Sequence, residues 1–288
     1  YNSTDQVFKV TISGTDVPDS WATAPLMGTG RTYLGGCGLQ TAALAFGGTY
    51  PPTTATEEYN GSSWTAGGAL GTARYTLGSA GTQTAALAIA GGFPVVSNVE
   101  SYNGSSWSAE TAYPTPTYAL AGCGLQTAAL AFGGAPSVRS TTFAYDGSSW
   151  TAGGALGTAR FTMGSAGLQT AALAFGGDAD PPITNITEEY DGSTWTAGGA
   201  MNTAREKLAG CGTQTAALGF GGYTGTAMAA NTEKYDGTSW TSTTSMNTAR
   251  QTLAGAGTQS AGFAFGGGNY FTEEFTLGSD ASRTITTT

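Results

Sequence analysis

The chain of 288 residues contains six similar repeats. Its six tryptophans are separated by 43, 43, 43, 45 and 45 residues, at Trp21, Trp64, Trp107, Trp150, Trp195 and Trp240. Gly-Gly pairs follow nearly the same period and begin at Gly47, Gly91, Gly133, Gly176, Gly221 and Gly266. A period of this length is typical of proteins in which each repeat is one small unit that buries its apolar face against its neighbours. The repeat therefore limits the fold to a ring or a stack of six similar units.

Each repeat contains four segments with the character of short strands. In the second repeat we expect the first strand to run from Arg74 towards Gly81 and the second to cover residues 84–89. The second segment is apolar at successive positions, which is typical of a strand buried on both faces. The third strand carries Glu-x-Tyr, and an Asn-Gly or Asp-Gly pair then predicts a tight hairpin into a fourth strand that bears the tryptophan. No longer segment has the apolar 3.6-residue period of a helix, so the pattern indicates an all-β protein.

Six units of four antiparallel strands predict a six-bladed β-propeller. Side-chain size supports this fold, because the first strand is rich in Gly, Ala and Ser, whereas Leu and Phe, then Tyr, then Trp follow in the next three strands. Such an increase in size fits blades that are crowded at the axis and spread apart at the rim. An open stack would instead need end repeats with polar outer faces, and the sequence contains none.

The two ends of the chain complement each other. The last repeat has its first three strands, up to Glu273-Glu274-Phe275, but no tryptophan follows, whereas Ser20-Trp21 precedes the first repeat. We therefore expect the N-terminal segment to supply the outer strand of the last blade and to close the ring. The predicted arrangement is a single domain over residues 1–288, with residues 1–30 supplying the closing strand, residues 277–288 as a tail or connection, and blades starting near residues 31, 74, 117, 160, 205 and 250. Residues 7–12 form one further strand-like run.

The Gly-Gly pair after the second strand, the following Tyr and Trp, and the arginine that starts five of the six units resemble the kelch repeat, over nearly the whole chain. The Gly-, Ala- and Thr-rich form, with Gly-Leu-Gln-Thr-Ala-Ala-Leu-Ala-Phe-Gly-Gly at residues 38–48, is similar to kelch-like repeats in fibre and decoration proteins of marine bacteriophages and in bacterial surface proteins. The resemblance implies a scaffold at the surface of a virion or a cell, exposed to the extracellular medium.

Composition excludes several kinds of chemistry. The chain has no histidine, which rules out Ser-His and Cys-His catalysis, histidine metal sites and the histidine-ligated copper of kelch-like radical oxidases. Its formal net charge is −9 and it has no basic run, which argues against a nucleic-acid partner. No stretch approaches the 18 apolar residues of a membrane span. We therefore expect a protein that is not an enzyme, that uses no cofactor or metal, and that does not insert into membranes.

An arginine and a glutamate recur at fixed positions of the repeat. Five units start with arginine, at Arg31, Arg74, Arg160, Arg205 and Arg250. Five third strands carry glutamate two residues before the aromatic, at Glu57, Glu100, Glu188, Glu233 and Glu273. The third repeat has Thr117 and Phe143 instead, so both charges are lost together. We infer a buried Arg–Glu ion pair within each of the other blades. The alternative is a cluster of arginines that binds an acidic ligand.

Two other residue types invite a functional interpretation that we regard as the weaker one. A glutamine occurs in every unit, at Gln40, Gln83, Gln126, Gln169, Gln214 and Gln259. A ring of amides could bind a polar ligand, but we expect each glutamine to hydrogen-bond backbone groups at the turn between its own first and second strands. Cysteine occurs in alternate units, at Cys37, Cys123 and Cys211, which separates the thiols too far for disulfides. Small buried residues of the inner strand are the expected role, and a threefold thiol site is the alternative.

The loops between second and third strands differ most between repeats, on a scaffold that is otherwise nearly constant. We expect them to share one face of the ring, and varied loops with aromatic residues on a rigid scaffold favour a recognition face. The alternative is that these loops vary because nothing constrains them. The candidate ligand-binding residues are Tyr50, Phe93, Arg139, Asp178, Asp180, Tyr223, Tyr270 and Phe271.

Three functions are consistent with this pattern. The first is a non-catalytic structural or recognition domain of a virion or cell surface, such as a phage fibre or decoration protein, that binds a host glycan or protein. The second is a purely architectural domain whose partners are other virion or surface proteins. The third, a sialidase-like glycosidase, needs an arginine cluster near the axis, whereas the arginines here recur once per blade.

Overall fold

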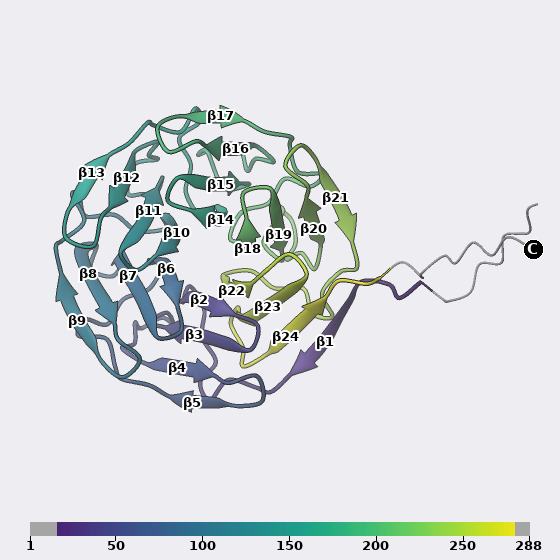
Figure 1. The fold of residues 1–288 in the computed structure, drawn as a ribbon, viewed down its shortest axis with the longest axis horizontal. Coiled ribbons are helices and arrows are strands. Elements are labelled where there is room, and N and C mark those ends of the chain that lie inside the picture. Colours follow the sequence, from purple (N-terminus) through teal and green to yellow (C-terminus); the bar gives the residue numbers. More distant parts are fainter. Residues whose placement is uncertain (1–15, 280–288) are drawn as a thin grey trace, which may run out of the picture.

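The chain forms a closed ring of six antiparallel sheets around a central axis. A computed structural model describes residues 16–279, and within this range there are 24 strands and no helix. Each sheet has four strands, and the six sheets are arranged radially, one per repeat (Figure 1). The predicted all-β six-bladed propeller is therefore confirmed. The predicted strand-like run at residues 7–12 lies outside the described residues.

The strands follow the repeat order, with the innermost strand first. Blade one consists of β2 (Gly35–Leu39), β3 (Ala42–Phe46), β4 (Thr56–Tyr59) and β5 (Trp64–Ala66). Blade two consists of β6 (Gly78–Thr82), β7 (Ala85–Gly91), β8 (Val96–Tyr102) and β9 (Trp107–Glu110). Blade three consists of β10 (Ala121–Leu125), β11 (Ala128–Phe132), β12 (Thr142–Tyr145) and β13 (Trp150–Ala152). Blade four consists of β14 (Gly164–Leu168), β15 (Ala171–Phe175), β16 (Thr187–Tyr190) and β17 (Trp195–Ala197). Blade five consists of β18 (Ala209–Thr213), β19 (Ala216–Phe220), β20 (Thr232–Tyr235) and β21 (Trp240–Thr243).

The sixth blade joins the two ends of the chain. Its sheet contains β22 (Leu253–Gly257), β23 (Ala261–Gly266), β24 (Thr272–Thr276) and, on the outside, β1 (Ser20–Ala24), in the order β1-β24-β23-β22. Trp21 of β1 is paired with Phe275 of β24. Figure 1 shows β1 at the rim beside β24, where the two ends of the described chain leave the ring together. The expected closure by the N-terminal segment is present.

The inner strands begin later than the sequence pattern predicts. In the second blade β6 starts at Gly78, so the expectation that the first strand starts at Arg74 is wrong. The reason is the backbone of Thr76, whose φ of 50° is left-handed and incompatible with a strand. Residues 74–77 instead belong to the loop between the outer strand of one blade and the inner strand of the next. We name them the entry segment of their blade, together with the equivalent residues 31–34, 117–120, 160–163, 205–208 and 250–253 of the other blades.

The core consists of apolar layers between adjacent blades. The second strands are buried from their second residue onward; Leu44, Ala45 and Phe46 of β3 have no exposed surface. Blades approach so closely near the axis that a Cβ on Gly36 would lie 2.5 Å from the ring of Phe265 in the neighbouring blade. Towards the rim, tryptophan indoles bridge neighbouring blades, as Trp107 does by donating to Thr56 Oγ1 at 3.0 Å. The increase in side-chain size from axis to rim therefore matches the wedge-shaped space between blades.

Candidate binding face

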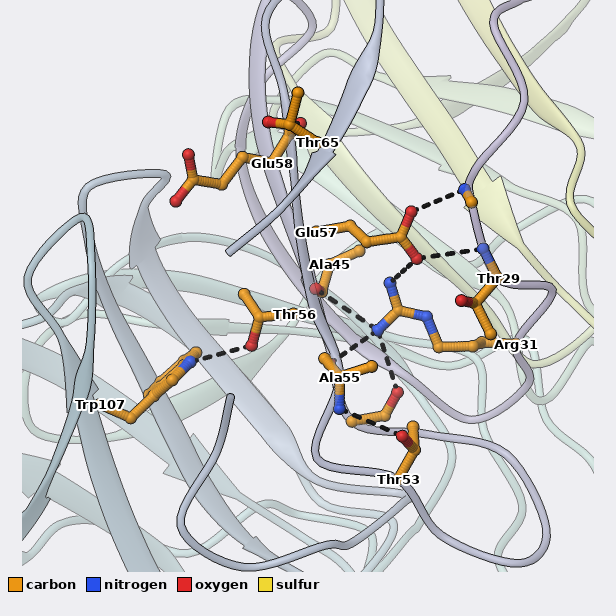
Figure 2. A network of polar contacts seen from close by, with 12 residues as sticks. Thr29, Arg31, Ala45, Thr53, Ala55, Thr56, Glu57, Glu58, Thr65 and Trp107 are labelled. Atoms are coloured by element: carbon orange, nitrogen blue, oxygen red, sulfur yellow. Dashed lines mark hydrogen bonds and ion pairs between the residues drawn. The ribbon is translucent and has the colours of Figure 1, made fainter. Parts of the chain in front are cut away.

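A buried ion pair holds the base of the variable loop in five of the six blades. In the first blade Arg31 Nη2 lies 2.7 Å from Glu57 Oε1, and the arginine side chain has no exposed surface (Figure 2). Arg31 Nη1 also donates to the carbonyls of Gly47 and Ala55, at 3.4 and 2.9 Å. These two residues are the two ends of the loop between the second and third strands. The guanidinium thus holds the variable loop at both of its ends.

The glutamate of the pair fixes the backbone just before the entry segment. Glu57 Oε2 accepts a hydrogen bond from the backbone N–H of Gly28 at 2.6 Å, and Oε1 accepts one from Thr29 at 3.2 Å. The same arrangement recurs in four other blades, with nitrogen–oxygen distances of 2.8 to 3.0 Å, in the pairs Arg74–Glu100, Arg160–Glu188, Arg205–Glu233 and Arg250–Glu273. All five predicted pairs are present and lie within blades. Their guanidinium groups are committed to protein groups rather than gathered at the axis.

The third blade fills the same position with aromatic rings. Phe143 replaces the glutamate and packs edge-on against Tyr113, with ring centroids 5.3 Å apart. Arg139, one of the candidate ligand residues, is half-buried beside this cluster; burial raises the pKa of the Tyr113 hydroxyl, and the nearby Arg139 charge opposes that rise. Among the described residues the Arg139 Nε has no hydrogen-bond partner. Arg139 therefore belongs partly to the packing of its blade.

The other candidate ligand residues lie on the loops as expected, but in separate places. Tyr50 and Phe93 are 75% and 61% exposed, and Tyr270 and Phe271 are 52% and 43% exposed. Asp180 is exposed and its backbone N–H donates to Asp178 Oδ1 at 2.8 Å. Within residues 16–279 no ring contact joins any two of the candidate aromatics. The candidates share a face without forming one cluster.

A tyrosine patch, consisting of Tyr33, Tyr50, Tyr75 and Tyr118, occupies one side of this face. The Tyr33 and Tyr75 ring centroids are 6.0 Å apart, and those of Tyr50 and Tyr75 are 6.1 Å apart with the rings nearly perpendicular. Burial raises the pKa of Tyr75, and the neighbouring hydroxyls of Tyr50, Tyr33 and Tyr118 raise it further. Three of the four residues lie in entry segments, which the sequence analysis did not consider. A signal that could have found Tyr75 and Tyr118 is that the residue after the unit-starting position varies as widely as the loops do, being Thr32, Tyr75, Tyr118, Phe161, Glu206 and Gln251.

A charged cluster occupies the opposite side of the face, on the fourth and fifth blades. Lys207 Nζ lies 2.8 Å from Glu206 Oε1 and 5.6 Å from the centre of the Tyr223 ring. Burial alone would lower the pKa of Lys207, but the hydrogen bond to Glu206 and the charge of Glu206, with smaller effects of Tyr33 and Asp178, together raise it. Thr162 Oγ1 donates to Glu206 Oε2 at 3.0 Å. Tyr223, a candidate ligand residue, is therefore half-buried beside an ion pair.

A ring of backbone hydrogen bonds surrounds the axis on this face. One residue of each entry segment donates its N–H to the carbonyl of the equivalent residue in the preceding blade, at 2.7 to 2.9 Å. All six are non-glycine residues with φ between 50° and 57°: Tyr33, Thr76, Ala119, Thr162, Lys207 and Thr252. Left-handed backbone costs about 1 kcal/mol or more per residue, so the closed ring of bonds compensates for strain.

Two cavities lie on the axis. The first, of about 100 Å³, lies within the ring of entry segments. The second, of about 230 Å³, runs between the inner strands towards the other face. Both are lined by the same six apolar side chains, which separate them: Leu34, Leu77, Leu120, Met163, Leu208 and Leu253. The face that carries the loops is thus shallow at its centre.

The glutamines contact the neighbouring blade, so the predicted bonding to their own turns is wrong. Gln83 Nε2 donates to the carbonyls of Ala43 and Tyr59 in the preceding blade, at 3.0 and 2.6 Å. The other five glutamines make the same pair of bonds. The reason is that the turn lies close enough to the sheet of the preceding blade for the glutamine side chain to reach that sheet. Each glutamine therefore ties two blades together.

The cysteines are buried and free. The thiols donate across to the next blade, Cys37 and Cys211 to carbonyls at 3.5 Å. Burial raises the pKa of all three to about 12. The described residues contain no group of three or more Cys, Asp or Glu side chains placed to hold a metal ion. They also contain no helix that is long and apolar enough to cross a membrane.

Comparison with known proteins adds no family assignment. No protein-family model matches the chain, and no curated protein matches its sequence. The fold itself defines the class: an all-β propeller of six blades with variable loops and entry segments on one face.

Proposed function

We propose that this propeller is a non-catalytic recognition domain that binds a host glycan or protein through the face formed by its variable loops and entry segments. The observation that carries the proposal is the contrast between scaffold and face. The ion pairs and interblade bonds recur in almost every blade, whereas the exposed aromatic residues Tyr50, Phe93 and Tyr270 differ from blade to blade. A rigid scaffold with varied, exposed aromatic loops suits specific binding.

We place the domain on the surface of a virion or a cell, as part of a phage fibre, a decoration protein or a comparable surface protein. This setting rests on the resemblance of the repeats to kelch-like repeats of phage and bacterial surface proteins. The commitment of the five guanidinium groups to glutamates favours a binding role over a sialidase-like one, which would need arginines free to bind an acidic sugar.

The proposal is tested by binding of the labelled protein to candidate host cells and to a glycan array. The triple variant Tyr50→Ala, Tyr223→Ala and Tyr270→Ala should lose most binding, because large exposed aromatics dominate such interfaces. Unchanged binding by a folded triple variant would count against the loop face.

A second candidate, an architectural domain, is favoured by the opposite face. The turn between first and second strands carries an exposed leucine in three blades, about half exposed in each case, at Leu39, Leu125 and Leu168. The same position holds threonine in the other three blades. Leucines exposed there suit packing against another part of an assembly. Replacing the three leucines by threonine should abolish self-association or partner binding in sedimentation experiments if this face is an assembly surface.

A further inference from the structure

The tyrosine patch differs from most tyrosines of the third strands in how its hydroxyls are used. Four of the five third-strand tyrosines donate to carboxylates of the preceding blade, as Tyr59 does to Glu274 at 2.8 Å and Tyr102 does to Glu58 at 2.5 Å. The hydroxyls of Tyr33, Tyr50, Tyr75 and Tyr118 make no hydrogen bond to another residue of the described chain. A phenol can both donate and accept a hydrogen bond. The patch therefore presents four hydroxyls that are available to a ligand.

The rings of the patch also leave aromatic surface open. The Tyr50 ring is nearly perpendicular to the Tyr75 ring, at an interplanar angle of 88°, and is 75% exposed, so most of its aromatic surface is open to solvent. Tyr33, Tyr75 and Tyr118 are half-buried and are held by the entry segments. Tyr33 belongs to the bonded ring around the axis and lines the 100 Å³ cavity. One exposed loop ring thus lies beside three half-buried rings of the entry segments.

The charges around the patch select against an ionic ligand. Of the cationic side chains in the described chain, five arginines are buried in ion pairs, Lys234 pairs with Asp19 at the rim, and Arg139 lies beside Tyr113 in the third blade. Lys207, whose pKa the nearby Tyr33 helps to raise, is paired with Glu206. No charged side chain belongs to the patch itself. A ligand bound there must find its partners in aromatic faces and neutral hydroxyls.

We propose that the tyrosine patch is a subsite for a neutral saccharide, a proposal that rests on the recognition function above. A pyranose ring has one apolar C–H face, which stacks on an aromatic ring, and hydroxyls at its edge that both donate and accept hydrogen bonds. Tyr50 supplies the stacking face, and the hydroxyls of Tyr33, Tyr75 and Tyr118 supply the polar contacts. Acidic sugars are disfavoured, because the patch has no free cation to pair with a carboxylate or sulfate.

The test measures binding of the intact chain to an array of neutral, sialylated and sulfated oligosaccharides, followed by titration of the best neutral ligand. Tyr50→Ala should weaken that binding about tenfold or more, and Tyr75→Phe, which keeps the ring and removes the hydroxyl, about threefold. Two control variants keep wild-type affinity: Tyr113→Phe removes a buried hydroxyl outside the patch, and Met228→Ala truncates an exposed loop side chain on the fifth blade. Thermal unfolding of every variant verifies that it is folded.

Three outcomes overturn the saccharide proposal. One is the absence of binding to any neutral oligosaccharide, and another is binding that the Tyr50 and Tyr75 variants leave unchanged. The third is binding to host cells that survives periodate oxidation of their glycans and is lost on protease treatment, which identifies a protein partner. In that last case the recognition function stands. Loss of cell binding in the Tyr223→Ala or Tyr270→Ala variant alone also leaves the recognition function standing and moves the site away from the patch.

Discussion

The Arg205–Glu233 pair offers the sharpest test of how the scaffold is held together. Both side chains are almost fully buried, with 0% and 1% of their surface exposed, and Arg205 Nη2 lies 2.9 Å from Glu233 Oε1. Arg205 Nη1 also donates to the carbonyls of Gly221 and Asn231, at 2.6 and 2.8 Å. Glu233 Oε2 accepts from the backbone N–H of Asn202 at 2.7 Å. Burial lowers the pKa of Arg205, and the charge of Glu233 opposes this change.

The single substitution Glu233→Gln leaves the arginine charge buried without its counter-charge. It also places an amide N–H against the N–H of Asn202. We expect a loss of about 3–5 kcal/mol in the free energy of unfolding, the usual cost of breaking a buried pair from one side. Arg205→Met leaves the glutamate charge buried alone and should cost a similar amount.

The double variant Arg205→Met with Glu233→Gln removes both charges. With the guanidinium gone, the amide introduced by Glu233→Gln can turn its oxygen towards the Asn202 N–H. What remains is the loss of the donors to the Gly221 and Asn231 carbonyls, which costs about 1–2 kcal/mol for each carbonyl. The two single effects should therefore exceed the double effect by about 2 kcal/mol or more. Guanidinium chloride unfolding of the four proteins measures these differences. Lys234→Met, which breaks a partly exposed pair with Asp19, is the control and should cost about 1 kcal/mol or less.

Two results would refute this reasoning. If Glu233→Gln costs less than about 1 kcal/mol, the arginine charge is not buried against the glutamate in solution. If the two single effects add up to the double effect, the residues do not interact, and the joint loss of both charges in the third repeat would be a coincidence.

Three further predictions concern pH, the thiols and the glutamines. Three exposed hairpin aspartates, Asp146, Asp191 and Asp236, accept hydrogen bonds from the residues that follow them. These bonds lower the pKa of Asp236 to about 2 and lower the pKa of Asp146 and of Asp191 further. The stability that these bonds add is complete above the unfolded pKa of about 4 and is lost as the pH falls through the folded pKa values. Replacing all three aspartates by Asn, the residue in blades one and two, should therefore flatten the fall of the thermal unfolding midpoint between about pH 4 and pH 2. An unchanged slope contradicts this. The three thiols should resist a thiol reagent at about pH 8 in the folded protein and all react in denaturant, because burial keeps them protonated; rapid labelling of the native chain would argue against the burial. Gln83→Ala should lower the free energy of chemical unfolding by about 1–2 kcal/mol. Gln83→Glu should lower it more, because a carboxylate cannot donate to the two carbonyls that accept from the Gln83 amide. Equal costs would mean that the amide is not the donor.

The periodic features of the fold could be predicted because they lie within one repeat. The Trp and Gly-Gly periods count the blades, and the hairpin signals order the four strands of each. The missing tryptophan of the last repeat predicts closure by β1. The Arg–Glu pair could be assigned to single blades because the third repeat loses both residues at once, and the five ion pairs lie where this variation places them.

Contacts between repeats could not be predicted in the same way. Glutamine occurs in every unit, so its pattern is the same whether it bonds its own turn or the preceding blade. The left-handed entry segments likewise appear in the sequence as ordinary strand residues, because their φ values are compensated by a ring of bonds that exists only when the six blades are closed.

The candidate site shows the same division. From the sequence alone it follows that the chain builds six four-stranded blades, and that its loops vary on one face, because both properties depend on residues close together in the chain. The tertiary structure alone decides which side chains meet there. It separates Tyr50 from the other predicted ligand residues and brings it beside Tyr75, in the entry segment of the next blade. That proximity depends on how the blades pack around the axis, so the spacing of residues within one repeat does not predict it.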